Sequence, residues 1–389
     1  IIPHGGENIF LLRYPMKAIA RILFTTIICV SLCSCGNVST RQHSNDTLRL
    51  EYSQLLHIKR HAGYTLVTIA DPWADNTTLH QYALVEDAAD MPATLPANTT
   101  VIRTPLKKMC VSTSVHASLF KMLGALDCIG SVCDVGYIMD STVRRQIADK
   151  KICDAGSSMN PSTERIMQLN TDAILMSPFK GTSYGVIEKT GIPIVECADY
   201  METSALGRAE WIKFYGMLIG KEQEAEQLFN EIKNNYLSLK HKTDTIRQRP
   251  KLLVDMLNAK TWYMPGGNSI YGELFSDAGA DYSIGDKKTS GTQALSLESV
   301  MTRALDADVW IIKYGQNEDF TYSSLNKENS AYHNFRAFKT HKVFGCNTLK
   351  VPFYDEAPFR PDILLADLIS ILHPQLLPDH KSKFYSPLK

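Results

Sequence analysis

The sequence lacks a net charge, a CxxC pair and the common nucleotide-binding motifs. Its 389 residues carry 41 basic and 41 acidic side chains, so the composition does not indicate nucleic acid as a partner. No Walker motif or dinucleotide fingerprint is present, and Gly266-Gly267-Asn268 is not expected to have the strand–helix geometry that such a fingerprint needs. A chain of this length with 44% apolar residues is typical of a globular protein of two lobes or domains.

The apolar run at residues 22–32 is too short to span a bilayer. It follows a basic segment at residues 16–21 and has the pattern of an export signal. The sequence at 32–36, Leu-Cys-Ser-Cys-Gly, resembles a bacterial lipobox, in which cleavage leaves Cys35 as the lipid-modified N-terminus. An ordinary signal peptide or a short anchor is the alternative.

We therefore expect residues 1–34 to be upstream residues and a signal peptide, and residues 35–48 to be a polar, flexible tether. Gly36, and not Asp, follows Cys35, which favours an outer-membrane anchor. The protein is then expected in the periplasm, in contact with a membrane through this lipid anchor alone.

Six cysteines lie beyond the N-terminal segment, mostly in apolar, strand-like surroundings. Without CxxC spacing, we expect buried free thiols rather than a zinc site. Export permits a disulfide, for instance Cys128–Cys133, but the sequence does not establish one. The six are Cys110, Cys128, Cys133, Cys153, Cys197 and Cys346.

Strands and helices are predicted from the apolar patterns. Residues 49–96 hold strand-like runs with no helix between them, which indicates an added antiparallel β segment. From residue 101 strands and helices alternate, and this predicts parallel sheets covered on both faces. The expected strands are 109–111, 128–132, 173–176, 192–195, 251–256, 309–313 and 343–344, and the expected helices are 114–126, 164–169, 185–190, 271–278, 297–304 and 359–372.

Between the two alternating blocks lies a strongly helical stretch, Ser204–Arg249, with an apolar stripe on one face. Gly220 is expected to break it, leaving a helix over 221–241 that is roughly 30 Å long and contacts both lobes. The predicted fold class is α/β, with two Rossmann-like lobes that hold parallel sheets, one long connecting helix and a ligand cleft between the lobes. The expected boundaries are 49–203 for the first lobe, 204–248 for the bridge, 249–375 for the second lobe and 376–389 for a tail.

Four motifs in this order resemble the class III substrate-binding proteins of ABC importers, which carry siderophores, haem or cobalamin. The resemblance covers about residues 100–375. It rests on NPSTE (160–164) with NTDAI (170–174), TGIPI (190–194), LSLES (295–299) with ADVW (307–310), and RPDIL (360–364) with LHP (372–374).

The resemblance implies a monomeric lipoprotein that captures a chelate and delivers it to a permease of the iron or cobalamin importer type. In this family one surface glutamate on each lobe pairs with permease arginines, and by position these are Glu164 and Glu298. A glutamate in the first turn of a helix is also stabilised by the helix dipole, so a purely structural role is the alternative.

The ligand cleft is expected at the loops that follow the strands. Aromatic residues recur in these loops, which suits a large planar or aromatic ligand. Lys180 and Arg208 could meet an anionic chelate, although Arg208 could equally pair with Glu202 or Glu210. The predicted ligand-binding residues are Tyr137, Phe179, Lys180, Tyr184, Tyr200, Arg208, Trp262, Tyr263, Tyr314, Phe353 and Tyr354.

Haem or a bare metal would need an axial ligand, for which His116, Tyr137 and Tyr184 are candidates. His57 and His61 lack a third ligand at metal spacing, so we expect no metal site in the protein and no resident cofactor.

Gly181-Thr182-Ser183-Tyr184-Gly185 matches the G-x-S-x-G pattern of serine hydrolases. A nucleophile elbow needs a strand that runs directly into the serine, and Pro178 ends the predicted strand some five residues earlier. We therefore expect a binding protein and no enzyme. The alternatives are a lipoprotein hydrolase that uses Ser183 and a chelate-scavenging lipoprotein that never meets a permease.

Overall fold

The computed structural model describes residues 47–181 and 183–389. The predicted signal peptide, the lipidation residue Cys35 and the tether as far as residue 46 lie outside the described residues. Within the described ranges, no helix is both long enough and apolar enough to cross a membrane.

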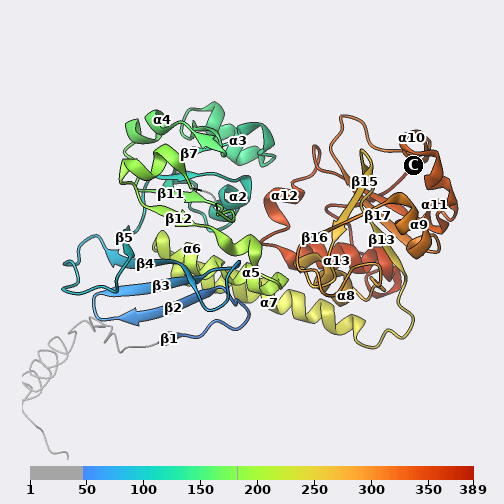
Figure 1. Cartoon of the computed structure of the whole chain (residues 1–389), viewed down its shortest axis with the longest axis horizontal. Helices are drawn as coiled ribbons and strands as arrows, with labels where there is room; N and C mark the ends of the chain where they lie inside the picture. Colours follow the sequence, from blue (N-terminus) through green and yellow to red (C-terminus); the bar gives the residue numbers. More distant parts are fainter. Residues whose placement is uncertain (1–46, 182) are drawn as a thin grey trace, which may run out of the picture. The chain divides into compact units, whose positions relative to one another are not determined.

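The described chain begins with a five-stranded sheet, drawn in blue in Figure 1. Neighbouring strands are antiparallel except for β4 and β5, which are parallel. The antiparallel strands agree with the segment predicted at 49–96, but the sheet extends beyond those bounds at both ends, through β1 and β5. The sheet order is β1 (Thr47–Leu48), β2 (Leu56–His61), β3 (Tyr64–Ala70), β4 (Thr78–Glu86) and β5 (Thr99–Thr104).

The first lobe is built on a parallel sheet with the order β12-β11-β6-β7-β8. Its central strands are buried along their whole length, as expected for a sheet with both faces covered. The strands are β6 (Met109–Val111), β7 (Ile129–Val132), β8 (Cys153–Asp154), β11 (Ala173–Met176) and β12 (Ile194–Glu196). A hairpin of β9 (Gly156–Ser157) and β10 (Asn160–Pro161) lies beside them, with helices α2 (Ser114–Met122), α3 (Ser141–Ala148) and α4 (Thr163–Gln168) and the 3-10 turns η1 (Leu126–Cys128), η2 (Val135–Tyr137), η3 (Gly185–Thr190) and η4 (Ala198–Met201).

The second lobe repeats the plan with a sheet of order β13-β17-β18-β19. Its first three strands are parallel, and β19 adds an antiparallel edge from residues predicted to be a tail. A smaller antiparallel sheet, β14-β15-β16, was not predicted. The strands are β13 (Leu252–Val254), β14 (Leu257–Asn258), β15 (Thr261–Pro265), β16 (Thr292–Leu295), β17 (Val309–Tyr314), β18 (Val343–Asn347) and β19 (Ser386–Pro387), and the helices are α8 (Ile270–Asp277), α9 (Leu297–Ala304), α10 (Tyr322–Glu328), η5 (Ser330–Asn334), α11 (Arg336–Lys339), α12 (Phe353–Glu356), α13 (Pro361–Leu372) and η6 (Pro374–Leu376).

The bridge consists of α5 (Ala205–Glu210), α6 (Ile212–Leu218) and the long helix α7 (Glu222–Thr243). Gly220 has a φ of +67°, a conformation that glycine adopts easily, and it separates α6 from α7 as predicted. Gly216 lets the two helices approach closely, because a Cβ there would lie 2.4 Å from Ala225 Cβ. The predicted α/β fold with two lobes and one long connecting helix is confirmed.

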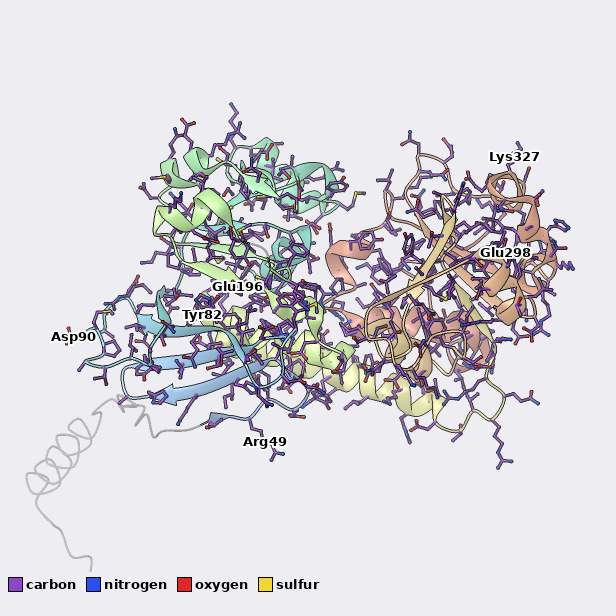
Figure 2. All side chains as sticks on the ribbon, viewed as in Figure 1. Arg49, Tyr82, Asp90, Glu196, Glu298 and Lys327 are labelled. Carbon is purple, nitrogen blue, oxygen red and sulfur yellow. The ribbon has the colours of Figure 1, made fainter. Side chains whose placement is uncertain are left out.

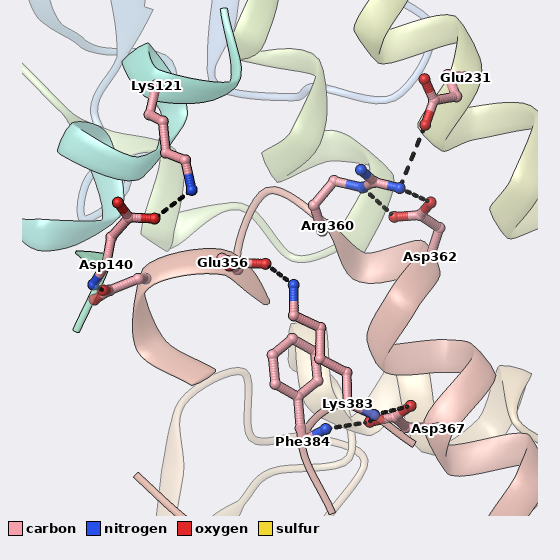
Figure 3. Close-up of polar contacts among 10 residues, drawn as sticks. Lys121, Asp140, Glu231, Glu356, Arg360, Asp362, Asp367, Lys383 and Phe384 are labelled. Atoms are coloured by element: carbon pink, nitrogen blue, oxygen red, sulfur yellow. Dashed lines mark hydrogen bonds and ion pairs between the residues drawn. The ribbon is translucent and has the colours of Figure 1, made fainter. Parts of the chain in front are cut away.

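Helix α7 contacts both lobes (Figure 1). On the first-lobe side, the Phe229 ring lies 6.2 Å from the ring of Tyr52. On the second-lobe side, the Tyr236 hydroxyl donates a hydrogen bond of 2.8 Å to Asp277, and Arg360 reaches Glu231 (Figure 3). A helix fixed at both ends restricts how far the two lobes can separate.

Two buried carboxylates fasten residues 51–55 to the bridge. Glu210, which is 0% exposed, accepts backbone N–H groups from Glu51, Tyr52 and Ser53 at 2.8–3.0 Å. Glu202 accepts from the next two N–H groups, at 3.0 and 3.1 Å. The segment that connects β1 to β2 is therefore held directly against the start of the bridge.

All six cysteines in the described residues are free. Cys128 and Cys133 flank β7 at its two ends. At about 3.3 Å per residue their Cα atoms lie roughly 16 Å apart, far beyond the reach of a disulfide. The Cys128–Cys133 pair that the sequence left open does not form in this fold.

Candidate functional site

A cavity opens at the carboxyl end of the first lobe's parallel sheet. β6 and β11 are neighbours there, but the chain leaves β6 toward β7 and later returns to β11 on the other side. Such a reversal is a topological switch point, where open α/β sheets bind ligands. The cavity, here called the switch-point pocket, has a volume of about 360 Å³ and is lined by Ser112, Thr113, Ser158, Met159, Asn160, Pro161, Thr163, Met176, Ser177, Phe179, Ser183, Tyr184, Gly185, Val186 and Ile187.

The lining combines hydroxyl groups with aromatic and sulfur-containing side chains. Among the residues described, it holds no Asp, Glu, Lys, Arg or His. Met159, Phe179 and Val186 are 76%, 52% and 66% exposed, whereas Met176 is buried. The pocket therefore offers apolar contact and neutral hydrogen-bonding groups, and it offers no ion pair.

The wall of the pocket is braced by the added sheet. Tyr184 donates its hydroxyl hydrogen to Glu196, and the Glu196 backbone N–H donates to the Tyr82 hydroxyl at 2.8 Å. Tyr82 itself donates to the Ile194 carbonyl at 3.0 Å, so β4 is tied to β12 (Figure 2). Burial raises the pKa of Glu196, and the hydrogen bond from Tyr184 acts in the opposite direction.

The loop after β11 is tied to the turn after β12. The Tyr200 hydroxyl donates to the Pro178 carbonyl, and the rings of Phe179 and Tyr200 lie 6.3 Å apart. The Tyr184 backbone N–H donates to Glu188 at 2.5 Å. These contacts hold Phe179 and Tyr184 at the pocket.

A buried charged cluster lies behind Thr113. His116 Nδ1 lies 2.6 Å from the Thr113 hydroxyl, and its Nε2 lies 2.9 Å from Asp199 Oδ1. Arg208 Nε donates to the other Asp199 oxygen at 2.9 Å, and Tyr215 donates to the first at 2.8 Å. Because both nitrogens of His116 are engaged, this residue is not placed to be an axial ligand, which corrects that candidate.

His116 and Asp199 form a buried ion pair. Burial opposes a charge on His116, but Cys197 and Asp199 beside it raise its pKa to about 10. Burial would also raise the pKa of Asp199, but the charges of His116 and Arg208 outweigh it and lower the pKa to about 2. Arg208 thus pairs with Asp199. The alternative prediction, that it pairs with Glu202 or Glu210, is wrong.

The second lobe contacts the first close to this cluster. Asp355 in α12 is 1% exposed and accepts the backbone N–H groups of Met139 and Asp140 at 2.9 and 3.1 Å. Asp140 is also paired with Lys121, and Glu356 with Lys383 (Figure 3). The α12 helix packs against α2, so the lobes meet directly as well as through α7.

The carboxyl edge of the second lobe holds a further ion pair that sequence reasoning missed. Lys313, near the end of β17, lies 2.6 Å from Asp255, which follows β13. Its Nζ also lies 5.7 Å from the centre of the Tyr271 ring. Asp255 was missed because its partner is 58 positions away, although its place directly after a buried strand was a usable signal.

The structure brings together three of the predicted ligand-binding residues. Phe179 and Tyr184 line the switch-point pocket, and Tyr200 contacts Phe179. The predicted cleft loop that begins at Ser177 does reach the pocket, but sequence reasoning missed most of the other lining residues, notably Ser112, although it directly follows a predicted strand. Of the remaining exposed candidates, Lys180 directly follows Phe179 without lining the pocket, and three lie elsewhere on the two lobes: Tyr137, Tyr263 and Tyr354.

Trp262 and Phe353 do not line a cleft, and their prediction is wrong. They are 0% and 1% exposed. Trp262 points inward from β15, donates to the Val254 carbonyl at 2.8 Å and packs on Trp310. Tyr314 is also buried, with its hydroxyl accepting from the Phe320 N–H at 3.1 Å.

Ser183 lines the pocket but does not stand on a nucleophile elbow. β11 ends at Met176, and the next element, η3, begins at Gly185. The Ser183 hydroxyl accepts from the Gly185 N–H at 3.3 Å. The strand–serine–helix turn that activates such a serine is therefore not built here.

The two predicted docking residues stand at equivalent places. Glu164 is exposed in the first turn of α4, directly after the lining residue Thr163, and accepts from Gln168 at 3.1 Å. Glu298 is exposed in the first turn of α9, in the second lobe (Figure 2).

The sequence and the fold of this chain are similar to those of known proteins. A lipoprotein of Methanocaldococcus jannaschii, itself uncharacterized, is 29% identical over 303 residues, 74% of this chain and 70% of that one. A periplasmic binding protein from Veillonella parvula shares the fold with a TM-score of 0.58 and 15% identity, over 80% of this chain and 98% of that one.

Two further solved structures share the fold. A possible iron-binding, periplasmic solute-binding protein from Staphylococcus epidermidis has a TM-score of 0.55 and 18% identity, over 69% of this chain and all of that one. A periplasmic heme binding protein from Pseudomonas aeruginosa has a TM-score of 0.54 and 16% identity, over 73% of this chain and 98% of that one. Residues 120–348, more than half of the chain, match the family described as periplasmic binding protein. The chain therefore belongs to the class III periplasmic binding proteins.

Proposed function

We propose that this protein is the lipid-anchored substrate-binding component of an ABC importer and that its ligand is a metal chelate of the siderophore, haem or cobalamin type. The observation that carries the proposal is the switch-point pocket. Its volume of about 360 Å³ lies within the usual range of ligand pockets. Its aromatic and methionine side chains suit a large ligand with extended apolar surface.

Phe179 and Tyr184 are the proposed primary contacts, because they line this pocket. Tyr200 is proposed as a contact beside them, because its ring lies 6.3 Å from that of Phe179. Tyr137, Lys180, Arg208, Tyr263 and Tyr354 are proposed to contact other parts of a ligand that extends toward the second lobe. The direct contact of α12 with α2 and the two-ended attachment of α7 favour small lobe movements on binding.

Glu164 and Glu298 are proposed to dock on arginines of the permease, one from each lobe. Both are exposed and stand in the first turn of a helix. Cys35 is proposed as the lipidated residue that holds the protein at a membrane in the periplasm, and the described body is proposed to act as a monomer.

Isothermal titration of the purified protein with a ferric siderophore, haem and cobalamin tests the ligand proposal. We expect saturable binding of at least one of them, weakened about tenfold or more by Phe179→Ala. Met91→Ala is the matched control, because Met91 is 52% exposed, like Phe179, and lies outside the pocket lining. Binding of none of the three, or equal effects of the two variants, would contradict the proposal.

A further inference from the structure

We infer that the switch-point pocket receives an uncharged part of the ligand, so that the chelate is electroneutral, such as a ferric tris-hydroxamate or a corrinoid, rather than a polyanion. The inference rests on the proposed function and narrows its substrate class. A ferric tris-catecholate and haem with its free carboxylates are the anionic chelates that it disfavours.

The composition of the lining is the first observation. A polyanion that leaves water loses strong solvation, and it needs cationic groups or many N–H donors in exchange. Within the described part of the chain, the pocket supplies Ser, Thr, Asn and Tyr side chains beside Met159, Met176 and Phe179, and no cation. Such groups can solvate hydroxamate or amide oxygens without balancing a net negative charge.

The second observation is that carboxylates lie directly behind the lining. Glu196 accepts the hydroxyl hydrogen of Tyr184 and is 9% exposed. Glu188 accepts the backbone N–H of the same tyrosine at 2.5 Å. Asp134 accepts the N–H of Ser158 at 3.2 Å, on the hairpin side of the pocket. An anion in the pocket would meet acidic groups on more than one side, and repulsion is screened less there than in water.

Three buried or half-buried cations outside the lining are already paired with carboxylates. His116 lies behind Thr113, but its charge is opposed by Asp199 at 2.9 Å, and Arg208 binds the same carboxylate. Lys313 on the second lobe is paired with Asp255. Lys180 is exposed beside Phe179, but it is not one of the lining residues.

Chelate charge follows from the donor groups. Three singly charged hydroxamates neutralise ferric iron, whereas three doubly charged catecholates leave a large negative excess. A corrinoid likewise carries amide side chains in place of carboxylates. The lining and the acidic groups behind it therefore distinguish these ligands by charge.

Isothermal titration at constant ionic strength, with a ferric tris-hydroxamate, cobalamin, a ferric tris-catecholate and haem, tests the inference. We expect the tighter of the two neutral chelates to bind about tenfold or more tightly than either anionic one. Val186→Lys should then shift the ratio of neutral to anionic chelate affinity about tenfold in favour of the anionic chelates. Val186 is 66% exposed in the lining, so a lysine is tolerated there. Val186→Gln is the uncharged control: it can alter the affinity for every chelate, but the ratio of neutral to anionic affinity should change by less than about twofold.

The outcomes separate the two proposals. Equal or tighter binding of an anionic chelate to the natural protein, or an unchanged ratio in Val186→Lys, would overturn the inference while a chelate-binding function still stands. Binding of none of the four chelates would overturn the proposed function and the inference with it.

Discussion

Replacing Glu210 by glutamine should loosen the N-terminal segment from the bridge. The Glu210 carboxylate is 0% exposed and accepts three backbone N–H groups at 2.8–3.0 Å. Hydrogen bonds to a charged group contribute about 1.5–3 kcal/mol each. Glutamine keeps the shape and one acceptor oxygen, but its NH₂ group faces N–H donors. We therefore expect the free energy of unfolding to fall by roughly 2–4 kcal/mol.

Urea unfolding at neutral pH measures this change, and hydrogen exchange locates it. The amides of residues 51–53 should lose protection in Glu210→Gln. Glu226→Gln is the matched control, because Glu226 belongs to the same network through Lys213 but is 48% exposed. Glu226→Gln should lower the free energy of unfolding by less than about 1 kcal/mol. A Glu210→Gln protein as stable as the control, with unchanged exchange at 51–53, would refute the reasoning.

The other predictions concern the buried ion pair, the braced wall and the docking surface. The pKa of His116 is raised to about 10. The stability that its charge contributes is therefore fully present below about pH 6.5 and is lost as pH rises toward 10. Urea titrations from pH 6 to 10 should show that the free energy of unfolding falls with pH in the natural protein and falls less in His116→Gln. Tyr82→Phe removes a hydroxyl that accepts from Glu196 and donates to Ile194, so thermal or urea unfolding should show a loss of about 1–3 kcal/mol, and an unchanged midpoint would contradict the brace. Glu164→Ala with Glu298→Ala should reduce chelate uptake by cells at least about tenfold while affinity in vitro is unchanged; unaltered uptake would contradict docking at these residues.

Local signals in the sequence predicted much of the fold. The strands Met109–Val111 and Ala173–Met176 and the helix Leu297–Ala304 have the predicted bounds, because each is a short apolar or amphipathic run with clear ends. Gly220 ends α6 through its own backbone preference. Such features depend only on residues that are close in the sequence, so they can be predicted from it.

The misses depend on contacts between distant residues. Glu202 and Glu210 were considered only as partners of the nearby Arg208, yet they are buried and bind the N–H groups of residues about 150 positions earlier. Trp262 was placed in a loop because the short strands β14 and β16, which pair with β15, were not recognised. In a strand, successive side chains alternate, which turns Trp262 into the core and Tyr263 outward.

The lining of the switch-point pocket was predicted only in part, because segments distant in the sequence contribute to it. The loop that holds Phe179 and Tyr184 follows a strand that was recognised, so these residues were found. Met159 and Asn160 reach the pocket from the β9–β10 hairpin, whose two-residue strands carry no sequence period.

The central claim is that a chelate binds at the switch-point pocket, and hydrogen exchange of the full chain with and without a saturating ferric tris-hydroxamate tests it most directly. We predict slower exchange at residues 158–163 and 177–187, the two segments that contribute most of the lining, and little change at the buried strand β13, which holds no proposed ligand contact. Unchanged exchange in both segments while the chelate is bound would contradict the claim.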